Sequence, residues 1–183
     1  RIFRLSFQRM NHLKNAPGAS GPTPSTAPHY KEFVSTVKHL RALQVLDAIS
    51  LSYHEENGVP QLVLYINEED KNREEAKQFA LAMNVEPGKT RYVLTFSPDF
   101  NATDQIRVVT RSLLGILFYL SQAVEVPSQD VLQGKVTRTK TPAGNIFNWQ
   151  EMTGDLLRIR SLPESPETGF MVIFYRGTWF YID

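Results

Sequence analysis

The longest apolar run in the chain extends from Leu113 to Val124 and contains only two polar residues, Ser121 and Gln122. A membrane-spanning helix needs about 20 apolar residues, so this run is too short to cross a bilayer. A helix that is apolar on nearly every side has to be surrounded by other parts of the fold. We therefore expect a central core helix that ends at Pro127, and no transmembrane segment in this chain.

The length and composition are those of a folded chain with a real core. The chain has 183 residues, of which 42% are hydrophobic and 21% charged. A chain of this length buries roughly two thirds of the surface that its unfolded form exposes. This composition excludes disorder over most of the length.

The charge balance and the lack of cysteine exclude several classes of function. The net charge is +1, which is not the strongly basic balance of a dedicated nucleic-acid binder, so any such role needs a local patch. The chain has no cysteine, which excludes disulfides, cysteine zinc sites and thiolate catalysis. The sequence does not determine the cellular compartment of the protein, and we favour the cytoplasm.

The first 28 residues differ in composition from the rest. Residues 1–14 contain Arg1, Arg4, Arg9 and Lys14 among apolar residues and have no acidic residue, and residues 15–28 are rich in proline and small polar residues. We expect residues 1–28 to form a basic arm and a linker, and residues 29–183 to form one globular domain. Arg4 and Arg9 are then candidates for contact with a partner.

The first half of that domain shows alternating helix and hairpin patterns. Apolar spacing of three and four predicts a helix over residues 29–47. Alternating runs at 49–54 and 61–66, joined through Asn57-Gly58, predict a β-hairpin. A second helix is expected between the acidic residues 68–70 and Pro87-Gly88.

The second half reads mainly as strands. We expect strands at 91–96, 106–109, 135–141 and 156–161, and a hairpin of residues 170–175 and 178–182 that turns at Arg176-Gly177. The predicted fold class is α+β, a single domain with mainly antiparallel strands packed on the apolar central helix, together with a C-terminal aromatic β-hairpin.

Two segments of the chain resemble a known group of sequences. RSLLGILFYLSQAVEVP (Arg111–Pro127) and YRGTWFYID (Tyr175–Asp183) are similar to stretches of an uncharacterised family of bacterial proteins. The resemblance covers the C-terminal part of the chain and has no activity attached to it. It implies a bacterial source and a further acidic, lysine-containing segment after Asp183, but no catalytic or binding residues.

No motif predicts a nucleotide, a metal or a cofactor. The glycines form neither of the two common phosphate-binding patterns, and all four histidines lie in the first third of the chain, away from any serine elbow. The one dense group of possible ligands is His54, Glu55, Glu56, Glu68, Glu69 and Asp70. Its spacing matches no metal motif, so we interpret it as a solvated turn and a helix N-terminus, and we expect no cofactor.

Two sets of residues carry the functional alternatives. Glu151 and Asp155 lie near Trp149 in the sequence and could serve as the acids of a hydrolase, although carboxylates four residues apart are common. A basic aromatic sheet face for nucleic acid could contain Arg158, Arg160, Arg176, Trp179 and Tyr181, together with Lys135, Arg138 and Lys140. The competing interpretation of that face is cross-strand aromatic pairs beside solvated arginines.

Arg111 lies at the start of the apolar helix, where the helix dipole disfavours a cation. We expect a carboxylate, with Glu125 and Asp183 as candidates, or an external anion to compensate it.

The function that these patterns favour is a non-catalytic binding or assembly module. It would contact a protein partner, or a second copy of itself, through the N-terminal arm or the C-terminal hairpin. Nucleic-acid binding and a hydrolase site near Trp149 are the alternatives.

Overall fold

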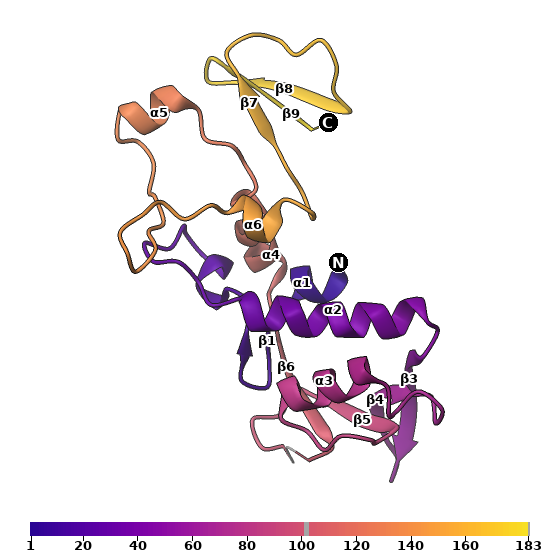
Figure 1. Ribbon diagram of the computed structural model, residues 1–183. Coiled ribbons are helices and arrows are strands. Elements are labelled where there is room, and N and C mark those ends of the chain that lie inside the picture. Colours follow the sequence, from indigo (N-terminus) through magenta and orange to yellow (C-terminus); the bar gives the residue numbers. More distant parts are fainter. Residues whose placement is uncertain (101–102, 183) are drawn as a thin grey trace. The chain divides into compact units, whose positions relative to one another are not determined.

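The computed structural model describes residues 1–100 and 103–182 (Figure 1). They form two compact units built from interleaved segments of the chain. Residues 2–17, 29–100 and 103–110 make up the first, which we call the sheet unit. Residues 1, 18–28 and 111–182 make up the second, the C-terminal unit. The chain is therefore α+β, as predicted, but its compact parts do not follow the expected boundary at residue 28.

The sheet unit contains a six-stranded sheet in the order β2-β1-β6-β5-β4-β3. The β5–β6 pair is parallel and the other neighbours are antiparallel, so the sheet is mostly antiparallel. The strands are β1 (Phe7–Met10), β2 (Leu13–Lys14), β3 (Ile49–Glu56), β4 (Val59–Ile66), β5 (Arg91–Thr95) and β6 (Gln105–Thr110). The helices are α1 (Ile2–Ser6), α2 (Lys31–Val45) and α3 (Glu74–Met83).

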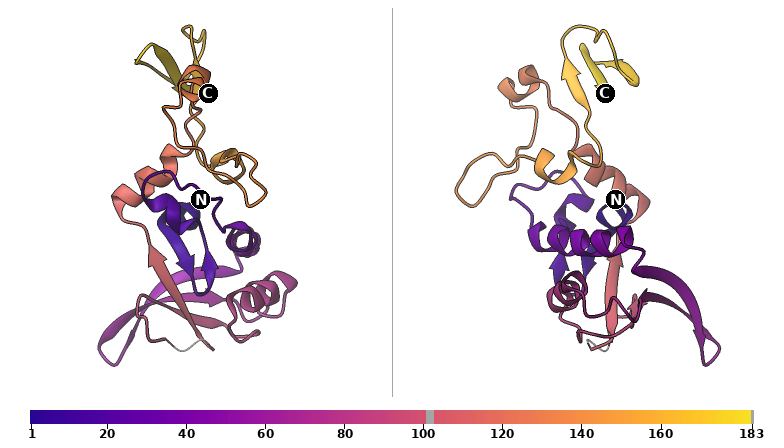
Figure 2. Two further views of the ribbon diagram at one scale, coloured as in Figure 1. Left: turned by 90° about the vertical axis from the view of Figure 1, so that its left-hand side faces the viewer. Right: turned by 45° about the vertical axis from the view of Figure 1, so that its right-hand side comes forward.

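Helices α2 and α3 pack together and form the main core with the sheet. The buried apolar residues of α2 recur every three or four positions, as the sequence predicted: Phe33, Val37, Leu40 and Leu43. Those of α3 are Ala76, Phe79, Ala80 and Met83. Each large apolar side chain buried here contributes about 1.5–3 kcal/mol. Strands β3 and β4 form the predicted hairpin, and the views in Figure 2 show it extending away from the helices of this unit.

The N-terminal segment is not the arm that the sequence predicted. Strand β1 pairs with both β2 and β6, and Met10 and Leu13 are buried in the main core. Phe3 and Phe7 also pack against this core, because burial of these apolar side chains between the arginines is favourable. Arg4 is buried and Arg9 is half-buried, so neither side chain extends freely into solvent.

The Pro-rich segment is also tied down. The amide of Lys140 donates to the carbonyl oxygen of Ser25 at 2.8 Å, and the amide of Ala27 donates to that of Lys140 at 2.8 Å. The hydroxyl of Thr139 donates to the carbonyl oxygen of Pro24 at 2.6 Å. Residues 18–28 therefore belong to the C-terminal unit, and residues 135–141 form isolated bridges in place of the predicted strand.

The C-terminal unit has short elements and a small sheet. Its helices are the 3-10 turn η1 (Pro17–Ser20), of which Pro17 belongs to the sheet unit, α4 (Leu113–Ser121), α5 (Ser128–Leu132) and α6 (Gln150–Thr153). Its strands β7 (Arg160–Leu162), β8 (Met171–Tyr175) and β9 (Thr178–Ile182) form an antiparallel sheet in the order β7-β9-β8. The predicted C-terminal hairpin is confirmed, with its two-residue turn at Arg176-Gly177.

Helix α4 is apolar as predicted but it is not a central core helix. Ser112 caps it, since the amide of Gly115 donates to the Ser112 hydroxyl at 3.1 Å. Only Gly115 and Tyr119 are buried, whereas Leu113 is 76% exposed and Leu114 and Leu117 are also exposed. The main hydrophobic core contains no residue of α4 and is formed by residues of the sheet unit. Among the described residues, no helix is long and apolar enough to cross a membrane.

Candidate functional site

The three-stranded sheet of the C-terminal unit has an outer strand, β8, that is exposed throughout. The sequence of β8 is MVIFY, and its five side chains are between 40% and 59% exposed. Phe170, just before it, is also exposed. Exposed apolar edge strands are typical of interaction surfaces, so β8 is the candidate site.

One face of this sheet is aromatic. Cross-strand partners point to the same side of a sheet, so the register places Phe174 beside Trp179 and Val172 beside Tyr181. The rings of Phe174 and Trp179 pack with their centroids 4.9 Å apart. Strand β7 adds Leu162 next to Trp179 and Arg160 next to Tyr181.

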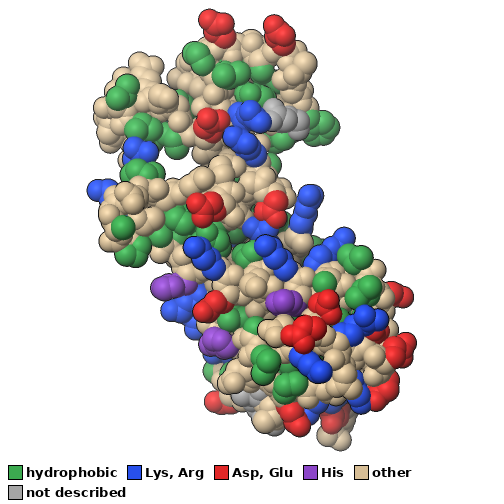
Figure 3. Space-filling model, viewed as in Figure 1, with side chains coloured by type: hydrophobic (Ala, Val, Ile, Leu, Met, Phe, Trp, Pro, Cys, Tyr) green, Lys and Arg blue, Asp and Glu red, His purple; other side chains and the backbone are tan. Residues whose placement is uncertain are grey.

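The opposite face is apolar as well. Ile173 lies beside Phe180, Met171 beside Ile182 and Tyr175 beside Thr178. A sheet in an ordinary antiparallel fold has one apolar face against a core and one polar face toward water. Here both faces carry partly exposed apolar side chains, and Figure 3 shows hydrophobic side chains at the surface of the C-terminal unit.

The turn between β8 and β9 fixes the hairpin register. Arg176 has φ of 50° and Gly177 has φ of 82°, which is the pattern of a type I′ turn that matches the twist of paired strands. The Arg176 guanidinium lies 5.3 Å from the centre of the Tyr175 ring. A basic group therefore stands at the end of β8.

The two edges of the small sheet differ. At the outer side of β7, the amide of Ile159 donates to the carbonyl oxygen of Ala123 at 3.1 Å, and the amide of Glu125 donates to the carbonyl oxygen of Ile159 at 2.8 Å. Residues 123–125 thus cover the chain where it enters β7. Strand β8 has β9 as its only strand neighbour among the described residues.

The structure brings together only part of the predicted basic aromatic face. Arg160, Trp179 and Tyr181 share one face of the sheet, and Arg176 lies in its turn. Arg158 precedes β7 and lines a cavity instead, and Arg4 and Arg9 belong to the sheet unit. The basic residues at 135, 138 and 140 lie outside any strand, because that segment pairs only through isolated bridges.

Sequence reasoning missed the residues that dominate this surface, namely Met171, Val172, Ile173 and Phe174. The signal was present, since MVIFY is an uninterrupted apolar run. An uninterrupted run is typical of a strand buried on both faces. Its exposure depends on what the rest of the fold places around it, which periodicity does not report.

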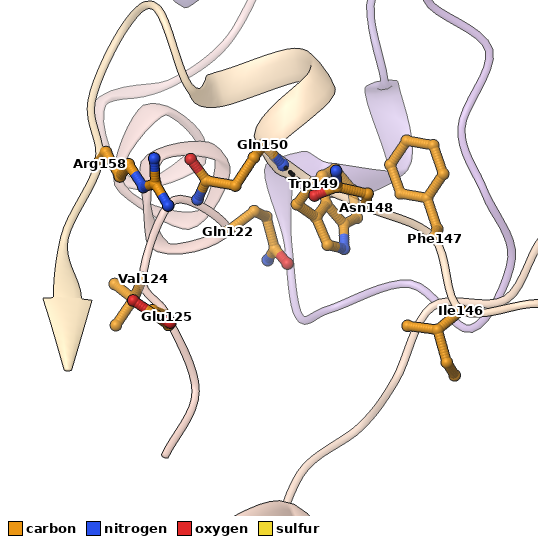
Figure 4. Close-up of a pocket in the computed structure, with 9 residues that line it drawn as sticks. All are labelled: Gln122, Val124, Glu125, Ile146, Phe147, Asn148, Trp149, Gln150 and Arg158. Atoms are coloured by element: carbon orange, nitrogen blue, oxygen red, sulfur yellow. Dashed lines mark hydrogen bonds between the residues drawn. The ribbon is translucent and has the colours of Figure 1, made fainter. Parts of the chain in front are cut away.

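A separate cavity of about 330 Å³ lies beside Trp149 (Figure 4). The Trp149 indole Nε1 donates to the Thr139 hydroxyl at 3.1 Å, and the side-chain amide of Gln150 donates to the carbonyl oxygen of Ala123 at 3.2 Å. The charged residues at its wall are Arg158 and Glu125. Glu151 and Asp155, the predicted hydrolase acids, are exposed and neither lines this cavity.

Arg111 is buried in the C-terminal unit. Its Nε donates to the Ser20 hydroxyl at 3.0 Å, and its guanidinium lies 4.2 Å from the centre of the Tyr119 ring. Burial lowers the pKa of Arg111 to about 10, so the side chain stays charged at neutral pH. The predicted carboxylate Glu125 instead accepts a hydrogen bond from the Ser161 amide at 3.4 Å, and Asp183 lies outside the described residues.

Comparison with protein-family models, curated proteins and solved structures finds no match. Within residues 1–100 and 103–182, no group of three or more histidine or carboxylate side chains is placed to hold a metal ion. The exposed C-terminal sheet is therefore the candidate functional site.

Proposed function

We propose that this chain is a non-catalytic binding or assembly module that contacts a protein partner through its C-terminal sheet. The observation that carries the proposal is the exposure of β8, in which all five residues are 40–59% exposed and none is charged. Covering such a strand removes apolar surface from water, which stabilises the complex by about 25 cal/mol for each Å² of apolar surface buried.

The composition of the surface favours a protein partner. The cores of protein interfaces are enriched in aromatic residues, methionine and arginine and are depleted in lysine and carboxylates. The small sheet has the same kinds of residue: Met171, Phe174, Trp179, Tyr181 and Arg160. Trp, Tyr and Arg are also the residues that most often dominate binding energy.

Nucleic acid is the weaker candidate for the same surface. Phosphate binding needs clustered basic groups. Arg160 is the one basic residue within strands β7, β8 and β9 of this small sheet. The loop that joins β7 to β8 adds the carboxylates of Glu164 and Glu167, which repel phosphate. The sheet has aromatic rings on which bases could stack, but it lacks the charge that would hold the backbone.

The fold does not favour contact with a partner through a free N-terminal arm. Removal of residues 1–28 would take two strands out of the large sheet together with buried Met10 and Leu13. The proposal therefore depends on the hairpin.

Site-specific photocrosslinking tests this proposal. A photoreactive phenylalanine analogue replaces Phe174 in the full chain, which is expressed in its native host, and crosslinked proteins are identified by mass spectrometry. The matched control carries the analogue at Tyr53, an exposed aromatic residue in β3 of the sheet unit. We expect a specific protein adduct from position 174 and none from position 53. No adduct from position 174, or the same adducts from both positions, would contradict the proposal.

A further inference from the structure

We infer that β8 pairs with β8 of a second copy of this chain, antiparallel and about a twofold axis through Ile173. The inference deepens the proposed function and rests on it, because it names the protein that covers the sheet. Pairing of this kind would join two three-stranded sheets into one sheet of six strands.

Strand β8 lacks the features that keep an edge strand from pairing. Natural edges are blocked by charged side chains, proline, bulges or a covering segment. Strand β8 has no charged residue and no proline, and its register with β9 runs from Met171 to Tyr175 without a bulge. The long edge strand of the other sheet, β3, differs in this respect because it carries His54, Glu55 and Glu56.

The backbone geometry of β8 suits antiparallel self-pairing. Alternate residues of an edge strand direct their amide and carbonyl groups away from the sheet. With the axis at Ile173, each residue lies opposite a residue whose number differs from its own by zero, two or four. Val172 lies opposite Phe174 of the second copy, and Met171 lies opposite Tyr175. At alternate positions of β8, outward groups then meet outward groups of the second copy. The aromatic face of one sheet continues into that of the other.

The charges at the two ends of β8 favour the antiparallel arrangement and a second copy as the occupant. The loop before β8 carries Glu164 and Glu167 and no basic residue, whereas the turn after β8 carries Arg176. All three side chains are exposed. Antiparallel pairing about Ile173 places Arg176 of each copy opposite Phe170 of the other, at the acidic end of that strand. The two ends are complementary, and the contact occurs twice because a twofold interface is isologous.

A single introduced cysteine tests the register, because the chain has none of its own. The Cα atoms of residues directly opposite in an antiparallel pair are about 4.5–5.5 Å apart, within the range that a disulfide spans. We expect Ile173→Cys to form a covalent dimer on mild oxidation at micromolar concentration. The control is Leu132→Cys, at an exposed position of α5 in the same unit, which should stay monomeric.

Charge reversal tests the pairing without changing the apolar strand. By sedimentation equilibrium we expect the wild-type chain to have twice its mass of 20.9 kDa. Arg176→Glu alone, or Glu164→Lys with Glu167→Lys, should weaken the dimer about tenfold at low ionic strength, since two symmetric exposed ion pairs are lost. The three changes together should restore it.

A wild-type chain that is monomeric at all concentrations, equal oxidation of the two cysteine variants, or no restoration in the triple variant would overturn the self-pairing. A monomer whose position 174 crosslinks to a different protein would overturn the self-pairing and leave the proposed function standing. A monomer with no adduct at position 174 would overturn both.

Discussion

Phe174 lies opposite Trp179 in the C-terminal hairpin, and their ring centroids are 4.9 Å apart. The contact holds two strands together, but Phe174 remains 55% exposed. Stable sheets normally bury one face against a second layer. In the function proposed above, a protein partner covers this surface.

Truncation of Phe174 should cost little stability in the isolated chain. Because the ring is more than half exposed, we expect Phe174→Ala to lower the free energy of unfolding by about 1 kcal/mol. Phe79→Ala, at a buried position in the main core, should cost about 3–5 kcal/mol. Urea denaturation combined with hydrogen exchange of each unit gives both values. Equal losses in the two variants would show that the Phe174 ring is buried in the isolated chain.

Asn15 should be a main determinant of the N-terminal fold. Its side chain is fully buried, and its amide donates to the carbonyl oxygens of Arg4 at 2.8 Å and Phe7 at 2.7 Å. Asn15→Ala would leave two carbonyl groups without these donors, so we expect a loss of about 2–3 kcal/mol in urea denaturation. Asn72→Ala, at an exposed position in the same unit, is the control and should change stability by less than about 0.5 kcal/mol. A neutral Asn15→Ala would mean that the N-terminal segment is not anchored there.

The aromatic ring of Tyr119 should stabilise the buried Arg111. Tyr119→Leu removes the ring from beneath the guanidinium and opens space in a buried site, with an expected loss of about 3 kcal/mol in thermal or urea unfolding. Tyr119→Phe keeps the ring and should cost much less. Similar losses in both variants would assign the stabilisation to the hydroxyl group.

The charge of Arg111 should leave stability independent of pH near neutrality. Its folded pKa of about 10 is below its ordinary value, so both folded and unfolded chains hold the proton from pH 6 to pH 9. Only between those two pKa values does the unfolded chain bind more protons, and there the Arg111 contribution rises with pH. The difference in unfolding free energy between wild type and Arg111→Met should therefore be flat from pH 6 to pH 9. A slope in that window would contradict this assignment.

Gly177 should be required for the hairpin turn. Its φ of 82° is unfavourable for a residue with a side chain, although the space around it is open. We expect Gly177→Ala to destabilise the β8–β9 pairing by about 1–2 kcal/mol, measured as faster amide exchange in these strands. Gly21→Ala has equally open surroundings and no positive φ, so it should leave exchange unchanged. Slow exchange in Gly177→Ala would show that another contact sets the register.

Local patterns predicted most of the elements correctly. The spacing of Phe33, Val37 and Leu40 predicted α2, and the Asn57-Gly58 and Arg176-Gly177 turns predicted both hairpins. These features depend on side-chain period and on positive φ, which are properties of short segments.

Tertiary placement was harder to predict. The arginines of residues 1–14 suggested a basic arm that extends into solvent. Met10 and Leu13 are buried instead, because β1 pairs with β6, about 100 residues away along the chain. Similarly, the apolar run of α4 predicted a buried helix, and Leu113 is exposed. In both cases the outcome depends on long-range partners that local sequence does not specify.

The most direct test of the central claim is side-chain footprinting by hydroxyl radicals inside the native host. Oxidation of Met171, Phe174 and Trp179 is compared with that of the same residues in the dilute purified chain. Tyr53 and Phe96, which are exposed in the sheet unit, serve as internal references. We predict that the β8 residues and Trp179 react several-fold less in the cell, while the two references are unchanged. Equal reactivity of Met171 and Phe174 in the cell and in dilute solution would contradict a protein-covered C-terminal sheet.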